Sequence, residues 1–361
     1  MHVGAATIFQ NPGKFSSDYD VYREELRLAD LAEPLGFQSI WGVEHHFTDY
    51  TMCPDVLQFL TYMAGRTTGM QLGSMVCVLP WHDPMRVAEQ VSMLDNLSDG
   101  RFILGVGRGL AKVEYDGFRV DMNESRTRFI ESAECLLAGL ESGFCEFDGE
   151  YIKQPRREIR PNPFRSFKDR TYAAAISPES SRIMAQLGVG MLVIPQKPWD
   201  EVERDLTNYR NAWYESHGTN STGPPPPVVA CWTFCHEDAD YARDMARRYI
   251  GGYWHTVMDH YQFKADHHKD IKGYEYYGKV AEKMFDYGDD EVVDFFVNLQ
   301  VWGTPEQCYD KILQIRDRTG HDTYVGAFSY AAMPYDVAEA SMRLFAAEVT
   351  PELKALTLGA A

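Results

Sequence analysis

The sequence lacks a surplus of positive charge. Its 361 residues include 53 aspartates and glutamates against 35 lysines and arginines, which gives a formal net charge of -18, and no basic run offsets this locally. A surface of this sign repels phosphate backbones and anionic lipid surfaces. We therefore expect neither nucleic acid nor a membrane as a partner.

Long hydrophobic runs, a secretion signal and cysteine clusters are also missing. No stretch approaches the roughly eighteen apolar residues of a membrane span, and the chain opens directly on the strand-like segment Val3–Phe9. The seven cysteines are scattered, and the pair Cys231 and Cys235 has no further ligands spaced to complete a zinc site. We expect reduced thiols, a cytoplasmic protein and no metal.

The chain alternates short apolar runs with longer stretches at helical spacing, which is typical of βα units and a parallel sheet. The pattern predicts an α/β fold, a (β/α)8 TIM barrel forming a single domain over residues 1–361. An open doubly wound sheet is the alternative, but Gly105-Val-Gly107 is only a fragment of the dinucleotide-binding motif. The eight predicted strands lie near residues 2–9, 38–43, 71–77, 101–106, 171–176, 190–194, 228–235 and 323–329.

Two segments exceed what a compact barrel needs. Residues 141–169 read as a loop rich in proline, arginine and aromatics before the fifth strand, and residues 253–298 precede the last helix and strand unit. Long excursions on a barrel often act as lids. We expect a mobile lid within 253–298, with a surface subdomain or an oligomer contact as the alternative.

The tetrapeptide Glu44-His45-His46-Phe47 follows a predicted strand at residues 39–43. Adjacent side chains on an extended strand point to opposite faces, so His45 and His46 are expected to do different jobs. One would face a cavity and the other would pack beside it. Ordinary loop histidines remain the alternative on these residues alone, and His82 is expected to be a loop residue.

Three further features predict a phosphate site at the carboxyl ends of the strands. Arg108 follows the fourth predicted strand, Arg126 begins a long helix, and Ser177-Pro178-Glu179-Ser180 has the pattern of a helix start whose free amides attract anions. Each alone has a simpler explanation, as a surface ion pair or a helix cap. Together they favour a bound phosphate.

At this level of detail the chain resembles the luciferase-like flavin monooxygenases, most closely the catalytic (alpha) subunit of bacterial luciferase. The resemblance is colinear over nearly the whole chain. It rests on Gly36-Phe37, Trp41, Glu44–Thr48, Val78–Pro80, Ala88-Glu89, Leu94-Asp95, Ser98–Phe102, Arg108–Leu110, Asp121-Met122, Ser125-Arg126, Gly303–Glu306 and Met342–Phe345.

This resemblance implies reduced FMN bound at the carboxyl ends of the strands, and oxidation of an organic substrate by O2 through a flavin peroxide. It implies that His45 is the catalytic base, and we expect Glu44 and His46 to position it. It also implies a non-prolyl cis peptide at Met75-Val76 beneath the flavin ring. The FMN phosphate is expected at Arg108, Leu110, Arg126, Ala174, Ser177 and Ser180.

The sequence departs from the luciferase pattern at four positions that shape the substrate pocket. Gly107 stands for a reactive cysteine, Ala111 for a tyrosine, Ile176 for an acidic residue and Ser329 for a glutamate. We therefore expect a different substrate, and we infer neither light emission nor a long-chain aldehyde substrate from the resemblance.

The leading hypothesis is a two-component monooxygenase that takes reduced FMN from a separate flavin reductase and inserts one oxygen atom into its substrate. Its partners would be O2 and a small organic molecule, and its assembly a homodimer. Hydride transfer by a deazaflavin-dependent oxidoreductase is one alternative. A non-catalytic flavin-binding partner subunit is the other.

Overall fold

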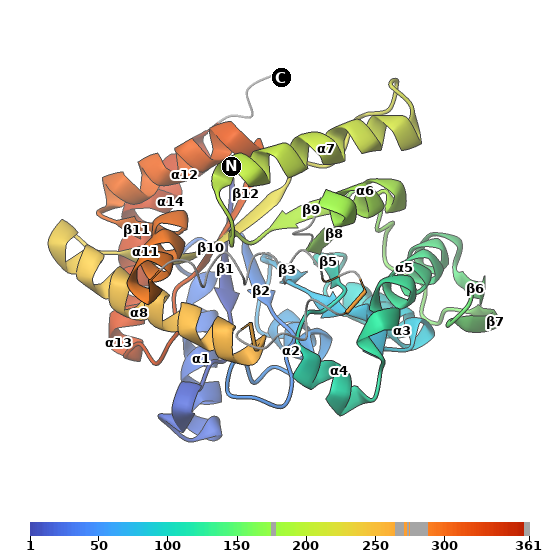
Figure 1. The fold of residues 1–361 in the computed structure, drawn as a ribbon, viewed down its shortest axis with the longest axis horizontal. Coiled ribbons are helices and arrows are strands. Elements are labelled where there is room, and N and C mark those ends of the chain that lie inside the picture. The colour runs from blue at the N-terminus through green and yellow to red at the C-terminus, as the bar shows by residue number, and fades with distance from the viewer. Residues whose placement is uncertain (175–177, 264–270, 273, 275–287, 357–361) are drawn as a thin grey trace.

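The fold is a closed barrel of parallel strands surrounded by helices (Figure 1). The computed structural model describes residues 1–174, 178–263, 271–272, 274 and 288–356. Each strand of the barrel pairs with the next, and the last one pairs with β1, so the sheet has no free edge. The barrel strands are β1 (His2–Thr7), β2 (Ser39–Gly42), β3 (Gln71–Ser74), β5 (Phe102–Gly107), β8 (Thr171–Ala174), β9 (Gly190–Val193), β10 (Val228–Cys235) and β12 (Thr323–Ala327).

The predicted (β/α)8 barrel is therefore confirmed, and every predicted apolar run overlaps one of its strands. The short strands β4 (Cys77–Val78) and β11 (Val301–Gly303) extend the sheet at the rim, where they pair with β5 and β10. The surrounding helices are α1 (Asp18–Ala32), α2 (Val56–Ala64), α3 (Pro84–Leu97), α4 (Lys112–Phe118), α5 (Ser125–Ser142), α6 (Pro178–Leu187), α7 (Trp199–His217), α8 (Ala239–His260), α11 (Asp289–Leu299), α12 (Pro305–Thr319), α13 (Tyr335–Leu344) and α14 (Thr350–Ala355).

In the structure Gly105-Val-Gly107 is part of β5, and its glycines allow close packing against the neighbouring segment. A Cβ atom on Gly105 would lie 1.9 Å from the carbonyl oxygen of Ser74, and one on Gly107 would lie 2.3 Å from the Val76 side chain. Ser74 Oγ also donates to the Gly105 carbonyl at 2.8 Å. Glycine is required because β5 passes so close to the segment that follows β3.

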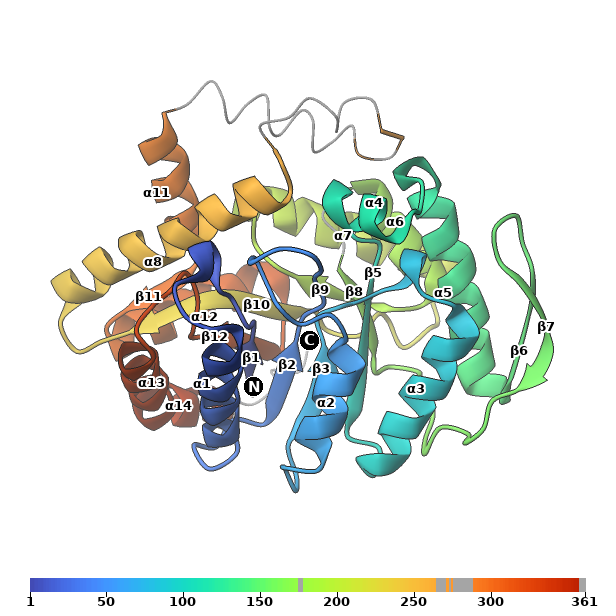
Figure 2. The same ribbon diagram turned by 90° about the horizontal axis from the view of Figure 1, so that it is seen from below.

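The insertion at residues 141–169 differs from the expected loop. It contains an antiparallel hairpin, β6 (Phe144–Asp148) and β7 (Lys153–Glu158), which lies beside α5 and away from the barrel (Figure 2). The carboxylate of Glu131 on α5 fixes its turn by accepting from the amides of residues 150, 151 and 152. Exposed charged side chains along β7 hide the alternation that would have predicted a strand.

The second insertion, 253–298, has different boundaries from those expected. Its first residues are the end of α8 and its last residues are α11. The predicted lid falls mainly on residues 264–270, 273 and 275–287, which lie outside the described residues. In the part of the chain that is described, no helix is long and apolar enough to cross a membrane.

A buried ion pair lies at the amino-terminal end of the barrel strands. The guanidinium of Arg170, just before β8, donates to both carboxylate oxygens of Asp95 on α3, at 2.6 and 2.8 Å. Both side chains are buried. The seven cysteines are likewise buried, and none forms a disulfide.

Candidate active site

A cavity at the carboxyl ends of the barrel strands brings together most of the predicted site residues. It is lined by the segments that follow β2, β3 and β5, by the end of β8, and by α4, α5 and α6. Ser177 lies outside the described residues, and His46 does not line the cavity. The predicted residues that line it are Glu44, His45, Met75, Val76, Arg108, Leu110, Arg126, Ala174 and Ser180.

His45 lies where this cavity meets a second one. Its side chain is 18% exposed, and it lines both cavities. The ring nitrogen Nδ1 lies 3.0 Å from Oε1 of Glu114, a residue of α4. An ionised carboxylate accepts the proton on Nδ1, so the lone pair of His45 is on Nε2.

Glu114 is a buried carboxylate shared between two histidines. Its side chain is 1% exposed, and Oε1 also accepts from the His46 amide at 2.8 Å. Burial alone would raise the pKa of Glu114, but the charge of His45 and the contacts with His260 and His45 outweigh it and hold the pKa at about 2. The carboxylate is therefore ionised at neutral pH.

His260, the last residue of α8, is the second of these histidines. The helices α4 and α8 lie over the same end of the barrel (Figure 2), and Nε2 of His260 is 3.4 Å from Oε1 of Glu114. Its Nδ1 lies 2.8 Å from Thr48 Oγ1, and Tyr50 stacks on the ring at 4.4 Å between centroids. Burial is the main cause that lowers the pKa of His260, so its ring is neutral.

Glu44 does not contact His45, contrary to the expectation that it positions this residue. Its Oε1 accepts from His46 Nε2 at 3.1 Å, Trp81 Nε1 at 2.9 Å and His82 Nε2 at 2.6 Å. Its Oε2 accepts from the Val78 amide at 3.0 Å. Glu44 and His46 thus hold the rim around β4, and Glu114 is the carboxylate at His45.

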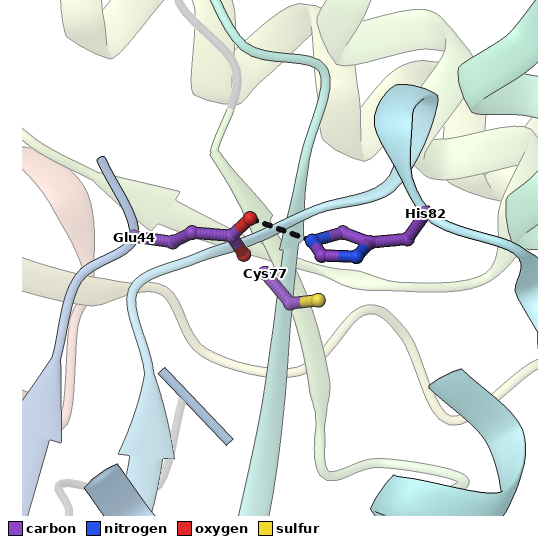
Figure 3. A group of neighbouring side chains, drawn as sticks. All are labelled: Glu44, Cys77 and His82. Carbon is purple, nitrogen blue, oxygen red and sulfur yellow. Dashed lines mark hydrogen bonds and ion pairs between the residues drawn. The ribbon is translucent and has the colours of Figure 1, made fainter. Parts of the chain in front are cut away.

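His82 has a defined partner that the sequence did not reveal. Figure 3 shows the Glu44 carboxylate facing the His82 ring, with Cys77 beside them. Burial opposes charge on His82, but the hydrogen bond and charge of Glu44 outweigh it and raise the pKa of His82. Burial would also raise the pKa of Glu44, yet its bonds from His46 and His82 hold that pKa at about 2.

The far end of the first cavity carries the two predicted arginines. Arg108 stacks over the Tyr274 ring at 4.0 Å, and Arg126 Nη1 donates to Glu179 Oε1 at 2.6 Å. Glu179 is largely exposed. Helix α6 begins at Pro178, as the sequence predicts, and its residue Ser180 reaches the cavity wall.

The second cavity lies deeper in the barrel mouth. Its lining includes the aromatic side chains of Tyr50, Trp232, Tyr253 and Tyr261, and no Asp, Glu, Lys or Arg is among the described residues that line it. The two cavities share Met75, whose peptide bond to Val76 is cis, as expected.

Sequence reasoning missed Glu114 and His260. Glu114 lies in a seven-residue helix without a recognisable motif, and His260 stands 146 positions further on at the end of a long helix. No sequence pattern singles out either residue. Whether a short helix or the end of a long helix is buried depends on how it packs against other elements.

Comparisons with known proteins agree with this geometry. The model of the family described as luciferase-like monooxygenase matches residues 1–323. The chain is 27% identical to the alkanal monooxygenase alpha chain of Photorhabdus luminescens over 362 residues, which cover 98% of both chains. It is also similar to the crystal structure of monooxygenase RslO1 from Streptomyces bottropensis, with a TM-score of 0.79, 25% identity, and coverage of 98% of this chain and 99% of that one.

Two more distant structures share the fold. The oxygenating constituent of 3,6-diketocamphane monooxygenase from Pseudomonas putida, in complex with FMN, has a TM-score of 0.74 and 17% identity, covering 98% of this chain and 99% of that one. An F420-dependent secondary alcohol dehydrogenase, with an F420-acetone adduct, has a TM-score of 0.71 and 14% identity, covering 96% and 98%.

Proposed function

The chain belongs to the luciferase-like monooxygenase family, and from this we propose that it is a flavin-dependent monooxygenase. In this proposal it uses reduced FMN and O2 to oxidise a small, uncharged organic molecule. The observation that carries the proposal is the position of His45 between a cavity with two arginines and a cavity lined by aromatic rings.

The lining of the first cavity fits FMN. Arg108 and Arg126 would hold the phosphate, with Ser180 beside them, while Met75 and Val76 offer an apolar surface to the flat ring system. Guanidinium groups suit phosphate because they present several donors in one plane. When bound, reduced flavin would supply the electrons that activate O2.

His45 is the base in this proposal. Glu114 keeps a proton on Nδ1, which leaves the Nε2 lone pair to accept a proton from a reacting group. The ionised carboxylate then stabilises the imidazolium that forms, as buried acid partners of catalytic histidines do. Glu114 is thus a positioning residue that acts through His45.

The second cavity would hold the substrate. Trp232 and Tyr253 both line it. Burying an unpaired charge in such a lining would be costly, which favours an uncharged substrate.

The proposal predicts that the protein changes the fate of reduced FMN. Anaerobic reduced FMN, preincubated with excess protein, is mixed with oxygenated buffer in a stopped-flow absorbance instrument. We expect oxidised flavin to appear much more slowly than from free reduced FMN, because a flavin held in the cavity is less accessible to water and protons. Oxidation at the rate of free reduced FMN would contradict the proposal.

The role of His45 is tested by His45→Asn. We expect FMN affinity to remain within a few-fold of the original, while product formation falls by ~100-fold or more, the usual contribution of a general base. The control is His255→Ala, a histidine whose side chain is 51% exposed. Equal turnover by His45→Asn and the control would show that His45 is not the base.

Hydride transfer with a deazaflavin is the second candidate, because a structural neighbour of the same fold uses F420. Titrating the protein with FMN and with F420 under the same conditions separates the two. Tight binding of F420 without binding of reduced FMN would favour the reductase.

We further propose that a separate reductase supplies the reduced FMN and that the chain forms a homodimer. Chemically reduced FMN should then support product formation without any reductase, whereas NADH with oxidised FMN should not. Light scattering of the purified chain tests the dimer.

A further inference from the structure

His45, Glu114 and His260 each place one ligand atom around a common point. Nδ1 of His45 lies 3.0 Å and Nε2 of His260 lies 3.4 Å from Oε1 of Glu114, and the three atoms lie within 4.8 Å of one another. Bonds of about 2.0–2.2 Å to Zn²⁺ put the neighbouring ligands of a tetrahedron about 3.3 Å apart. The two distances to Glu114, 3.0 and 3.4 Å, are close to this spacing.

His260 presents an unsatisfied nitrogen to this point. Its side chain is 1% exposed, and among the described residues Nε2 has no hydrogen-bond partner. Its Nδ1 can donate to Thr48 Oγ1, which leaves a lone pair on Nε2 facing the Glu114 carboxylate. A lone pair opposite a carboxylate is unfavourable, and a cation between them would satisfy both.

The surrounding contacts resemble the second shell of a metal site. Ligating histidines usually donate their other N–H to a nearby oxygen, an arrangement that the 2.8 Å spacing of His260 Nδ1 and Thr48 Oγ1 permits, and ligating carboxylates are themselves hydrogen-bonded. Glu114 accepts from the His46 amide at 2.8 Å.

We propose that His45, Glu114 and His260 bind a divalent transition-metal ion of the Zn²⁺ type, and that the bound ion switches the active site off. Two histidines and one carboxylate leave a further position for water. The sequence predicted no metal because these ligands come from three distant segments. The binding step stands independently of the proposed function, and only the inhibition rests on it.

Inhibition follows from the protonation of His45. Without metal, the proton is on Nδ1 and the lone pair on Nε2. When Nδ1 binds the ion, its proton leaves that nitrogen, and the neutral ring carries its proton on Nε2 instead. The nitrogen that served as the base then has no lone pair to accept a proton.

A second cluster, Glu44, Cys77 and His82, is a weaker candidate (Figure 3). Both carboxylate oxygens of Glu44 already accept hydrogen bonds. Burial raises the pKa of the Cys77 thiol well above its ordinary value, so the thiol keeps its proton, and His82 Nε2 is already bonded to Glu44 at 2.6 Å. This cluster supplies a matched control.

The test is calorimetric titration of the full-length, untagged protein with Zn²⁺ at neutral pH, without flavin. We expect one site, weakened by ~10–100-fold or more in His260→Gln and in Glu114→Gln, since even outer-shell changes have effects of this size. His82→Gln should bind Zn²⁺ as the original chain does. Thermal unfolding of each variant establishes that it is folded.

Cobalt provides a readout that needs no variant. Co²⁺ bound by two imidazoles and a carboxylate at low coordination number absorbs visible light far more strongly than the aqueous ion, and Zn²⁺ should abolish the band. No saturable binding, unchanged affinity in folded His260→Gln, or loss of binding in His82→Gln would each overturn the site.

The inhibition is measured separately, as the Zn²⁺ concentration that halves substrate oxidation. It should match the dissociation constant, and a chelator should restore the rate. Zn²⁺ that binds at this site without slowing turnover would overturn the switch. If the chain oxidised no substrate at all, the proposed function would fail, whereas the calorimetric result would still decide the metal site.

Discussion

Replacing Glu44 by glutamine should destabilise the protein strongly although it changes one atom. The carboxylate receives four hydrogen bonds, three on Oε1 and one on Oε2. A glutamine can accept at only one of these two positions. Its amide group would then face at least one N–H donor in a buried place, which usually costs about 1–3 kcal/mol.

The pKa gives an independent magnitude for the same change. Despite burial, the bonds from His46 and His82 and the His82 charge lower the pKa of Glu44 from 4.5 to about 2. This difference means that the site favours the ionised over the neutral group by about 3 kcal/mol. Because His82 and Glu44 report the same interaction, the effect is counted once. We expect Glu44→Gln to lower the free energy of unfolding by about 3 kcal/mol.

The pH dependence of this loss has a definite sign. A depressed carboxylate pKa stabilises the fold above pH 4.5, and that stabilisation is lost as the pH falls toward 2. A raised histidine pKa stabilises it below 6.5, and that part is lost as the pH rises through the folded pKa of His82. The difference in free energy of unfolding between the original chain and Glu44→Gln should therefore be largest between pH 4.5 and 6.5.

The assay is equilibrium urea unfolding of both proteins at pH 5.5, 7 and 8.5. His82→Gln serves as a second variant that removes the histidine charge and leaves the carboxylate. A difference below about 1 kcal/mol at every pH, or one that grows steadily from pH 5.5 to 8.5, would refute the account of Glu44 as a charged hub.

Three further predictions concern other parts of the molecule. Asp95→Ala leaves the buried guanidinium of Arg170 unpaired, so urea unfolding should show that the free energy of unfolding falls by about 3–5 kcal/mol. A decrease below about 1 kcal/mol would contradict this. Arg126→Gln should weaken FMN binding by ~10-fold or more while riboflavin binding stays unchanged. Equal weakening of FMN and riboflavin binding would show that Arg126 does not hold the phosphate. Burial raises the pKa of Glu25 from 4.5 to about 7, so the fold loses up to about 3 kcal/mol as the pH rises across this range. Glu25→Gln should flatten that dependence, and an unchanged slope would refute it.

The barrel was predictable because its determinants are local. Parallel strands covered by helices are buried on both faces, so they appear as short continuous apolar runs, as in β5 and β10, where every residue is buried. The hairpin of β6 and β7 was not predictable, because most of its residues lie outside the core. The contact that fixes its turn, Glu131 with the turn amides, joins residues 19 to 21 positions apart.

The sequence also predicted that the residues proposed to hold the FMN phosphate lie together. Arg108 directly follows β5, Ala174 ends β8 and Ser180 lies in the first turn of α6, and the carboxyl ends of parallel strands meet at one face. The places of Glu114 and His260 in the site could not be predicted, because they depend on how α4 and α8 pack over that face. His82 lies in a loop, as predicted, but its partner Glu44 could not be predicted because it is 38 positions away.

The misplaced role of Glu44 has a local explanation that the sequence did contain. In an extended chain, residues i and i+2 share a face, whereas neighbouring residues point apart. Glu44 and His46 therefore lie on one side of the segment after β2, and His45 on the other. The observed bond from His46 to Glu44, and from His45 to Glu114, follows this alternation. A carboxylate adjacent in sequence cannot serve His45 here, so its partner has to come from another element.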